Sequence, residues 1–100
     1  MTSKLREAKI NSIIEVAISY ALKYGFHSLT IRKLAHAINM PESSIRAYFK
    51  KFNNFKKQVM RAAIDKKIYL VIAQGLAMRD SDAIKISRTL KKRAVKTLLD

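Results

Sequence analysis

The sequence predicts an all-α protein of about five helices, organised as a single domain over residues 1–100. Almost half of the 100 residues are apolar, and along most of the chain they recur at the spacings of three and four that are typical of amphipathic helices. Glycine occurs twice and proline once, so there is little material for the turns of a sheet.

The first helix is expected from about Ser3 to Tyr24. Its apolar positions follow helical spacing and are Ile10, Ile13, Ile14, Ala17, Ile18 and Ala21. Gly25 is expected to end this helix, because a glycine directly after the last periodic residue accommodates the left-handed conformation that closes many helices.

Two short helices are expected next. The second helix begins at Thr30, whose hydroxyl can cap the amides of the first turn, and it ends near Asn39, which tolerates a left-handed backbone. The third starts close to Pro41, since proline suits the first positions of a helix. Ile45 and Phe49 are four residues apart and are expected to point to the core.

A long fourth helix is expected from about Asn53 to Met78, followed by a break over residues 80–82. A fifth, amphipathic helix then carries Ala83, Ile86, Leu90, Ala94 and Leu98 on its apolar face. The second half of the fourth helix is apolar on several sides, which predicts burial beyond one face. A small monomer is only marginally stable, so the protein is expected to be a homodimer. Its interface is expected within residues 53–100. The predicted dimerisation residues are Ile68, Leu70, Val71, Ile72, Gly75 and Leu76.

The composition favours a polyanionic partner. Lysine and arginine number 21 against 7 acidic residues, giving a formal net charge of +14. Such a bias is typical of proteins that bind nucleic acid or an anionic membrane surface. The most apolar stretch, residues 68–78, is much shorter than the roughly 20 residues that span a bilayer, so no membrane partner is expected. Cysteine is absent, which fits an intracellular, reducing compartment.

Catalytic and metal-binding chemistry is not expected. The acidic residues are scattered, and the chain has neither a glycine-rich phosphate loop nor a nucleophile motif. His27 and His36 lie nine residues apart without a neighbouring carboxylate or cysteine. We therefore expect no enzyme activity, no cofactor and no metal.

Residues 25–52 read as two short amphipathic helices joined by a tight turn, and they resemble the DNA-binding domain of the tetracycline-repressor (TetR) family. The resemblance covers about the first 60 residues. It rests on Gly25-Phe26, Thr30, Leu34-Ala35, the Ile38-Asn39-Met40 turn, Ile45, Tyr48-Phe49 and Phe55. It implies a three-helix, homeodomain-like helix-turn-helix unit over about residues 3–52, with the next helix packed behind it.

The chain also departs from the family pattern. The family usually has glycine at the position of Asn39, tyrosine at that of Arg46 and lysine at that of Phe52. Arg46 would replace a hydroxyl contact with a charged one, and nearby lysines would compensate for the missing lysine; these are Lys50, Lys51, Lys56 and Lys57. Only about 40 residues follow the resemblance, where the family carries a large ligand-binding domain. No small-molecule inducer is therefore expected.

The resemblance also implies which residues meet DNA. A major groove about 12 Å wide admits one α-helix, and the third helix has short outward side chains that allow close approach. Ala47 suits a thymine methyl, and Glu42 suits a cytosine amino group. Arg46 either reads guanine or holds a phosphate. The full predicted set is Thr30, Arg32, Glu42, Ser43, Ser44, Arg46, Ala47, Tyr48, Lys50, Lys51 and Lys56, with Thr30 and Tyr48 as phosphate contacts and Arg32 at the groove edge.

Together these features predict a sequence-specific, double-stranded DNA-binding protein, a small transcriptional regulator that acts as a repressor. As a homodimer it would bind an inverted repeat with half-sites one helical turn apart. The location implied is the cytoplasm, associated with the nucleoid. Two alternatives remain: an architectural or replication-associated protein that coats DNA without sequence preference, and a helical adaptor that binds a partner protein. The Lys91-Lys92-Arg93 run is either a solvated face or a contact to flanking phosphates.

Overall fold

The computed structural model describes residues 2–49 and 52–99, which form six α-helices and two 3-10 turns and contain no strand. The all-α class is therefore confirmed. In chain order the elements are α1 (Thr2–Tyr24), η1 (Phe26–Ser28), α2 (Ile31–Ile38), α3 (Glu42–Phe49), α4 (Phe52–Asp65), α5 (Tyr69–Ala77), η2 (Ala83–Lys85) and α6 (Arg88–Leu99).

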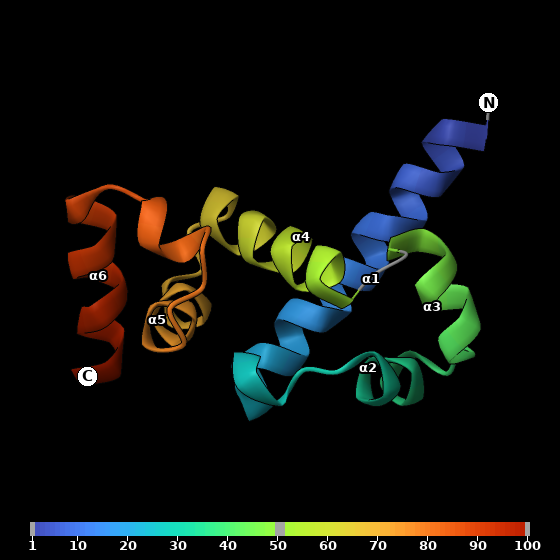
Figure 1. Cartoon of the computed structure of the whole chain (residues 1–100), viewed down its shortest axis with the longest axis horizontal. Coiled ribbons are helices and arrows are strands. Elements are labelled where there is room, and N and C mark those ends of the chain that lie inside the picture. The colour runs from blue at the N-terminus through green and yellow to red at the C-terminus, as the bar shows by residue number, and fades with distance from the viewer. Residues whose placement is uncertain (1, 50–51, 100) are drawn as a thin grey trace.

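The helices are arranged around the crossing of α1 and α4 (Figure 1). On one side of this crossing α2 and α3 pack against each other, with α2 on α1 and α3 on α4. On the other side α5 packs against α4, and α6 packs against α5. The molecule is elongated as a result, with extents of 39 × 27 × 19 Å.

One hydrophobic core runs through both sides of the crossing. The inward positions of α1 are buried as their spacing predicts, including Ile13, Ala17 and Ala21. Phe49 and Phe55 are fully buried and meet edge to face, with ring centroids 5.1 Å apart. Edge-to-face packing is a favourable arrangement of aromatic rings, and here it holds the end of α3 against α4.

The turn between α2 and α3 has the structure that its residues predict. The Thr30 hydroxyl accepts a 3.1 Å hydrogen bond from the amide of Lys33 and caps α2. Asn39 is left-handed, with φ 55° and ψ 48°. The amide of Met40 donates to the carbonyl of Ala35 over 3.0 Å, and the amide of Asn39 donates to His36. These two bonds form a Schellman motif, which satisfies free carbonyls at the end of α2.

The expected long helix over residues 53–78 is wrong, because the chain turns between α4 and α5. Lys67 is left-handed with φ 56°. The amide of Ile68 donates to Ala63 over 2.9 Å, and that of Lys67 donates to Ile64 over 3.1 Å. This is the same Schellman motif with lysine in the place usually taken by glycine. The turn folds the apolar α5 back onto the rest of the molecule, where α1, α4 and α6 cover it.

The expected fifth helix begins later than its apolar spacing predicts. Residues 83–85 form the 3-10 turn η2, and α6 begins at Arg88, where the Ser87 hydroxyl accepts from the amide of Leu90 over 3.2 Å. Before η2, a carboxylate oxygen of Asp80 accepts from the amides of Asp82 and Ala83, each over 3.0 Å. A side-chain oxygen that captures nearby amides favours a turn over a continuous helix.

Three of the predicted dimerisation residues belong to the core of the single chain. Val71 and Ile72 are 0% exposed, and Gly75 is buried. A Cβ atom at Gly75 would overlap the terminal methyl of Met60 and lie 3.2 Å from Cβ of Ala83. The close approach expected at Gly75 therefore occurs between α5 and its own neighbours α4 and η2. The other three, which are Ile68, Leu70 and Leu76, are half-buried. Within the described part of the chain, no helix has both the length and the apolar character needed to cross a membrane.

Candidate nucleic-acid interface

The outer face of α2 and α3 carries most of the predicted DNA-binding residues. Both helices use positions three and four apart for the core, with Leu34 of α2 and Ile45 and Phe49 of α3 all 0% exposed. The positions between them therefore face solvent. The exposed residues of this face are Arg32, Lys33 and His36 on α2 and Glu42, Ser43, Arg46 and Ala47 on α3.

The face of α3 combines short side chains with one ion pair. Ser43 and Ala47 are exposed, and Ser44 is half-buried. A guanidinium nitrogen of Arg46 lies 3.5 Å from Oε1 of Glu42, and the two side chains are 58% and 45% exposed. An exposed pair at this spacing contributes only about 0.3–0.5 kcal/mol. Arg46 can therefore leave Glu42 for a phosphate or a base at little cost.

The charge on this face is predominantly positive. Arg32, Lys33 and Arg46 are exposed on it, and Glu42 is the only acidic residue in the sequence of α2 and α3. Other acidic side chains interact elsewhere: Glu15 lies 3.7 Å from Lys66 of α4, and a carboxylate oxygen of Asp82 lies 3.2 Å from Nε of Arg61. Clusters of cations with few nearby anions attract phosphate backbones.

Arg6, which the sequence did not single out, supports the far end of α3. Its guanidinium lies 5.3 Å from the centre of the Tyr48 ring and donates a 3.2 Å hydrogen bond to the carbonyl of Ala47. A carbonyl in the last turn of a helix lacks a partner within the helix, so Arg6 satisfies one and links α1 to α3. Tyr48 is half-buried in this contact. The role of Arg6 could not be recognised from the sequence, because its hydrogen bond joins residues 41 positions apart.

Lys56, which is also a predicted DNA contact, is half-buried and makes contacts within the fold. Its ammonium donates a 2.6 Å hydrogen bond to the carbonyl of Phe26 and lies 4.0 Å from the centre of the Phe26 ring. Desolvation by burial lowers the pKa of Lys56 below 10.5, and the nearby charge of Asp80 opposes this shift. Its role is to link α4 to η1. Two other predicted contacts, Lys50 and Lys51, lie outside the described residues.

Phe26 is held from a second side by Gln74. The amide of Phe26 donates to Oε1 of Gln74 over 2.7 Å, and the Phe26 ring is 1% exposed. Gly25 precedes it with φ 98°, a conformation that residues with a Cβ rarely adopt. The chain entering α2 is therefore fixed by contacts from α4 and α5, which positions the face formed by α2 and α3.

The described residues carry a basic, polar surface and no gathered metal ligands. No group of three histidine, cysteine, aspartate or glutamate side chains lies together in residues 2–49 and 52–99. His27 and His36 are exposed on η1 and α2. The chemistry available on α2 and α3 is thus hydrogen bonding and charge. Comparisons of the chain with protein-family models, with curated proteins and with solved structures found no match.

Proposed function

We propose that this protein binds double-stranded DNA in a sequence-specific manner and acts as a small transcriptional repressor. The observation that carries the proposal is the face of α3, where Ile45 and Phe49 are fully buried while Ser43, Arg46 and Ala47 are exposed. Such a helix has an anchored inner side and a short, polar outer side, which is what entry into a major groove requires.

Each helix has a distinct part in this proposal. Helix α3 lies in the groove and presents Ser43, Arg46 and Ala47 to base edges. Helix α2 crosses the DNA backbone, and Arg32 and Lys33 lie within reach of phosphates. Phosphate contacts supply affinity and register, while base contacts supply specificity. The net charge of +14 supports the affinity that comes from phosphate contacts.

The proposal includes a homodimer, and the exposed apolar side chains of α6 support it. Val95, Leu98 and Leu99 are 44%, 53% and 82% exposed. Replacing Leu98 and Leu99 with glutamine is expected to shift the protein towards monomer in sedimentation experiments. Leu5→Gln, at an exposed leucine of α1, is the control. A wild-type protein that sediments as a monomer with and without DNA would contradict this part of the proposal.

The test of DNA binding is selection of bound duplexes from a random pool at about 150 mM salt, where non-specific phosphate binding is weakened. The expected result is an enriched inverted repeat with half-sites about one helical turn apart. An enriched single half-site would support specific binding by a monomer. An unenriched pool would overturn specific recognition.

Non-specific coating of DNA is the second candidate, and the net charge of +14 favours it. Binding to random duplex then falls steeply with salt and does not distinguish sequences. Competition with unrelated DNA separates the two functions. In the adaptor alternative, the partner would bind the apolar surface over residues 68–78, of which Val71 and Ile72 are buried within the fold.

A further inference from the structure

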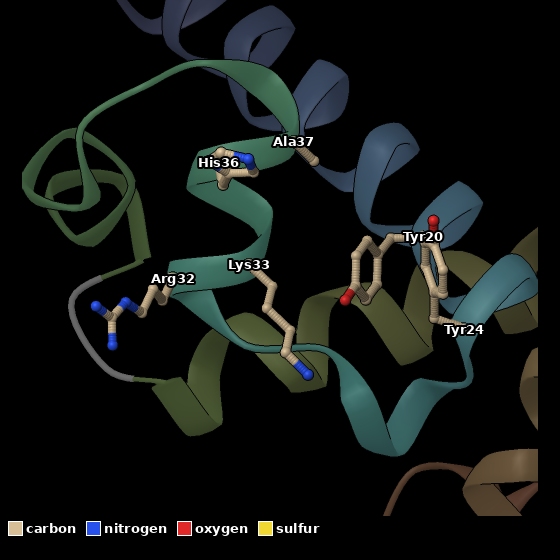
Figure 2. A pocket seen from close by; sticks show the side chains of 6 residues that line it. All are labelled: Tyr20, Tyr24, Arg32, Lys33, His36 and Ala37. Carbon is tan, nitrogen blue, oxygen red and sulfur yellow. The ribbon is translucent and has the colours of Figure 1, made fainter.

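An open groove runs between the end of α1 and the outer side of α2, with a volume of about 590 Å³ (Figure 2). Its lining residues are Tyr20, Tyr24, Arg32, Lys33, His36 and Ala37. This volume falls within the range of about 300–1,000 Å³ that is usual for small-molecule sites.

The wall formed by α1 is aromatic. The rings of Tyr20 and Tyr24 lie one helical turn apart, with centroids 4.7 Å apart and planes inclined at 43°. Tyr20 is half-buried and packs against the core, while Tyr24 is 53% exposed. Lys23 lies with its ammonium 5.2 Å from the centre of the Tyr24 ring. A fixed pair of rings with an open side offers a surface on which a planar aromatic ligand can stack.

The wall formed by α2 is cationic. Arg32, Lys33 and His36 come from neighbouring turns, and none of the described residues that line the groove is acidic. Among the described residues, no ion pair engages the side chains of Arg32 or Lys33. Figure 2 shows Lys33 on the side of α2 that faces the tyrosines, whereas the guanidinium of Arg32 points away from them.

We propose that this groove binds a nucleotide, with the base stacked on Tyr20 and Tyr24 and the phosphate held by Lys33. An aromatic ring that carries a phosphate matches both walls at once, because aromatic side chains stack on bases and an ammonium group pairs with phosphate oxygens. The same chemistry is present in a free mononucleotide and in one nucleotide of an unpaired strand.

Calorimetry with AMP, adenosine and inorganic phosphate tests the proposal at about 150 mM salt, where long-range attraction to the charged protein is screened. The expected result is saturable binding of AMP with a dissociation constant at or below about 1 mM. Adenosine and phosphate are expected to bind at least about fivefold more weakly, because each meets only one wall. A single-stranded trinucleotide identifies the source: tighter binding than AMP indicates a strand, and equal or weaker binding indicates the free nucleotide.

Substitutions of residues that line the groove test whether AMP binds there. Tyr24→Ala is expected to weaken AMP binding at least about fivefold, the lower end of the loss when one stacking ring is removed, whereas Tyr24→Phe keeps the ring and the affinity. Lys33→Ala is expected to weaken it about two- to fivefold. Lys85→Ala is the charge-matched control, because Lys85 is exposed on η2 and does not line the groove. Circular dichroism confirms that each variant is folded.

Two results would overturn the proposal. One is the absence of saturable AMP binding to the folded wild-type protein. The other is an equal effect of Lys33→Ala and Lys85→Ala combined with no effect of Tyr24→Ala, which would show attraction to net charge alone. The assay contains no duplex DNA, so its outcome is independent of the proposed function.

Discussion

The amide of Phe26 donates a 2.7 Å hydrogen bond to Oε1 of Gln74, a residue 48 positions further along the chain. Gln74 is the only polar residue in the sequence of α5 apart from the Tyr69 hydroxyl. The bond satisfies a half-buried backbone donor next to a fully buried ring. It joins the segment that enters α2 to the helix at the other side of the molecule.

Replacing Gln74 with leucine is expected to lower the free energy of unfolding by about 1–3 kcal/mol, because the amide of Phe26 loses its acceptor in a partly buried place. Urea denaturation measures this change. Gln74→Glu is the control, since a carboxylate oxygen still accepts the bond. A leucine variant as stable as the wild type would show that water replaces Gln74 without cost.

Glu42→Gln is expected to raise the affinity for random duplex DNA by about two- to fivefold, because it removes the one carboxylate of α2 and α3 and releases Arg46 from its exposed ion pair. Fluorescence anisotropy with labelled duplex measures this. An equal affinity in variant and wild type would contradict the prediction. If Glu42 also accepts from a cytosine, the selected sequence becomes less restricted at that base pair.

Arg46→Ala separates the two roles left open for this arginine. If Arg46 reads a guanine, the loss is about 1–3 kcal/mol on the selected site and much smaller on random DNA. If it holds a phosphate, affinity falls alike for both, and the dependence of log K on log salt decreases by about 1. Titrations of both duplexes at several salt concentrations distinguish these outcomes. Unchanged affinity for every sequence would remove Arg46 from the interface.

The pKa of Lys56 predicts how stability depends on pH. Because burial lowers its pKa in the folded state, the unfolded chain binds more protons between that value and 10.5, and stability rises with pH across this window. At pH values below the folded-state pKa, Lys56 is charged in the folded protein, and the free-energy cost of burying this charge is fully present. We expect the wild type to gain stability relative to Lys56→Met as the pH rises from neutral towards 10.5 in urea titrations. A constant difference would show that Lys56 titrates at its ordinary value.

The sequence predicted the helices whose limits are set by local chemistry. Thr30 and Asn39 are recognisable because a capping hydroxyl and a left-handed asparagine act within a few residues. The left-handed turn at Lys67 carries no such sign, since lysine is a good helix former and apolar residues continue on both sides of it. The sequence therefore predicted one long helix where the structure has α4 and α5.

The exposed side of α3 could be predicted from the sequence, whereas two long-range contacts near it could not. The spacing of Ile45 and Phe49 predicts which side of α3 is buried, so Ser43, Arg46 and Ala47 were placed on the exposed side. Arg6 and Lys56 depend on contacts across 41 and 30 positions. Neither contact follows a period within one helix, so a pattern along the chain identifies neither.

Lys67→Gly is expected to stabilise the protein by up to about 1 kcal/mol, because glycine adopts the left-handed conformation without the cost that a Cβ carries there. For a chain of this size, that gain raises the melting temperature by about 4–8 °C. Lys67→Ala is the decisive control, since it removes the same positive charge but keeps the Cβ, and it is expected to give no such gain. Arg79, with φ 58°, offers an independent repeat through Arg79→Gly and Arg79→Ala. If alanine stabilises as much as glycine at both positions, the gain comes from reduced charge repulsion in a protein of net charge +14. If neither variant changes the melting temperature, the left-handed lysine carries no strain for glycine to relieve.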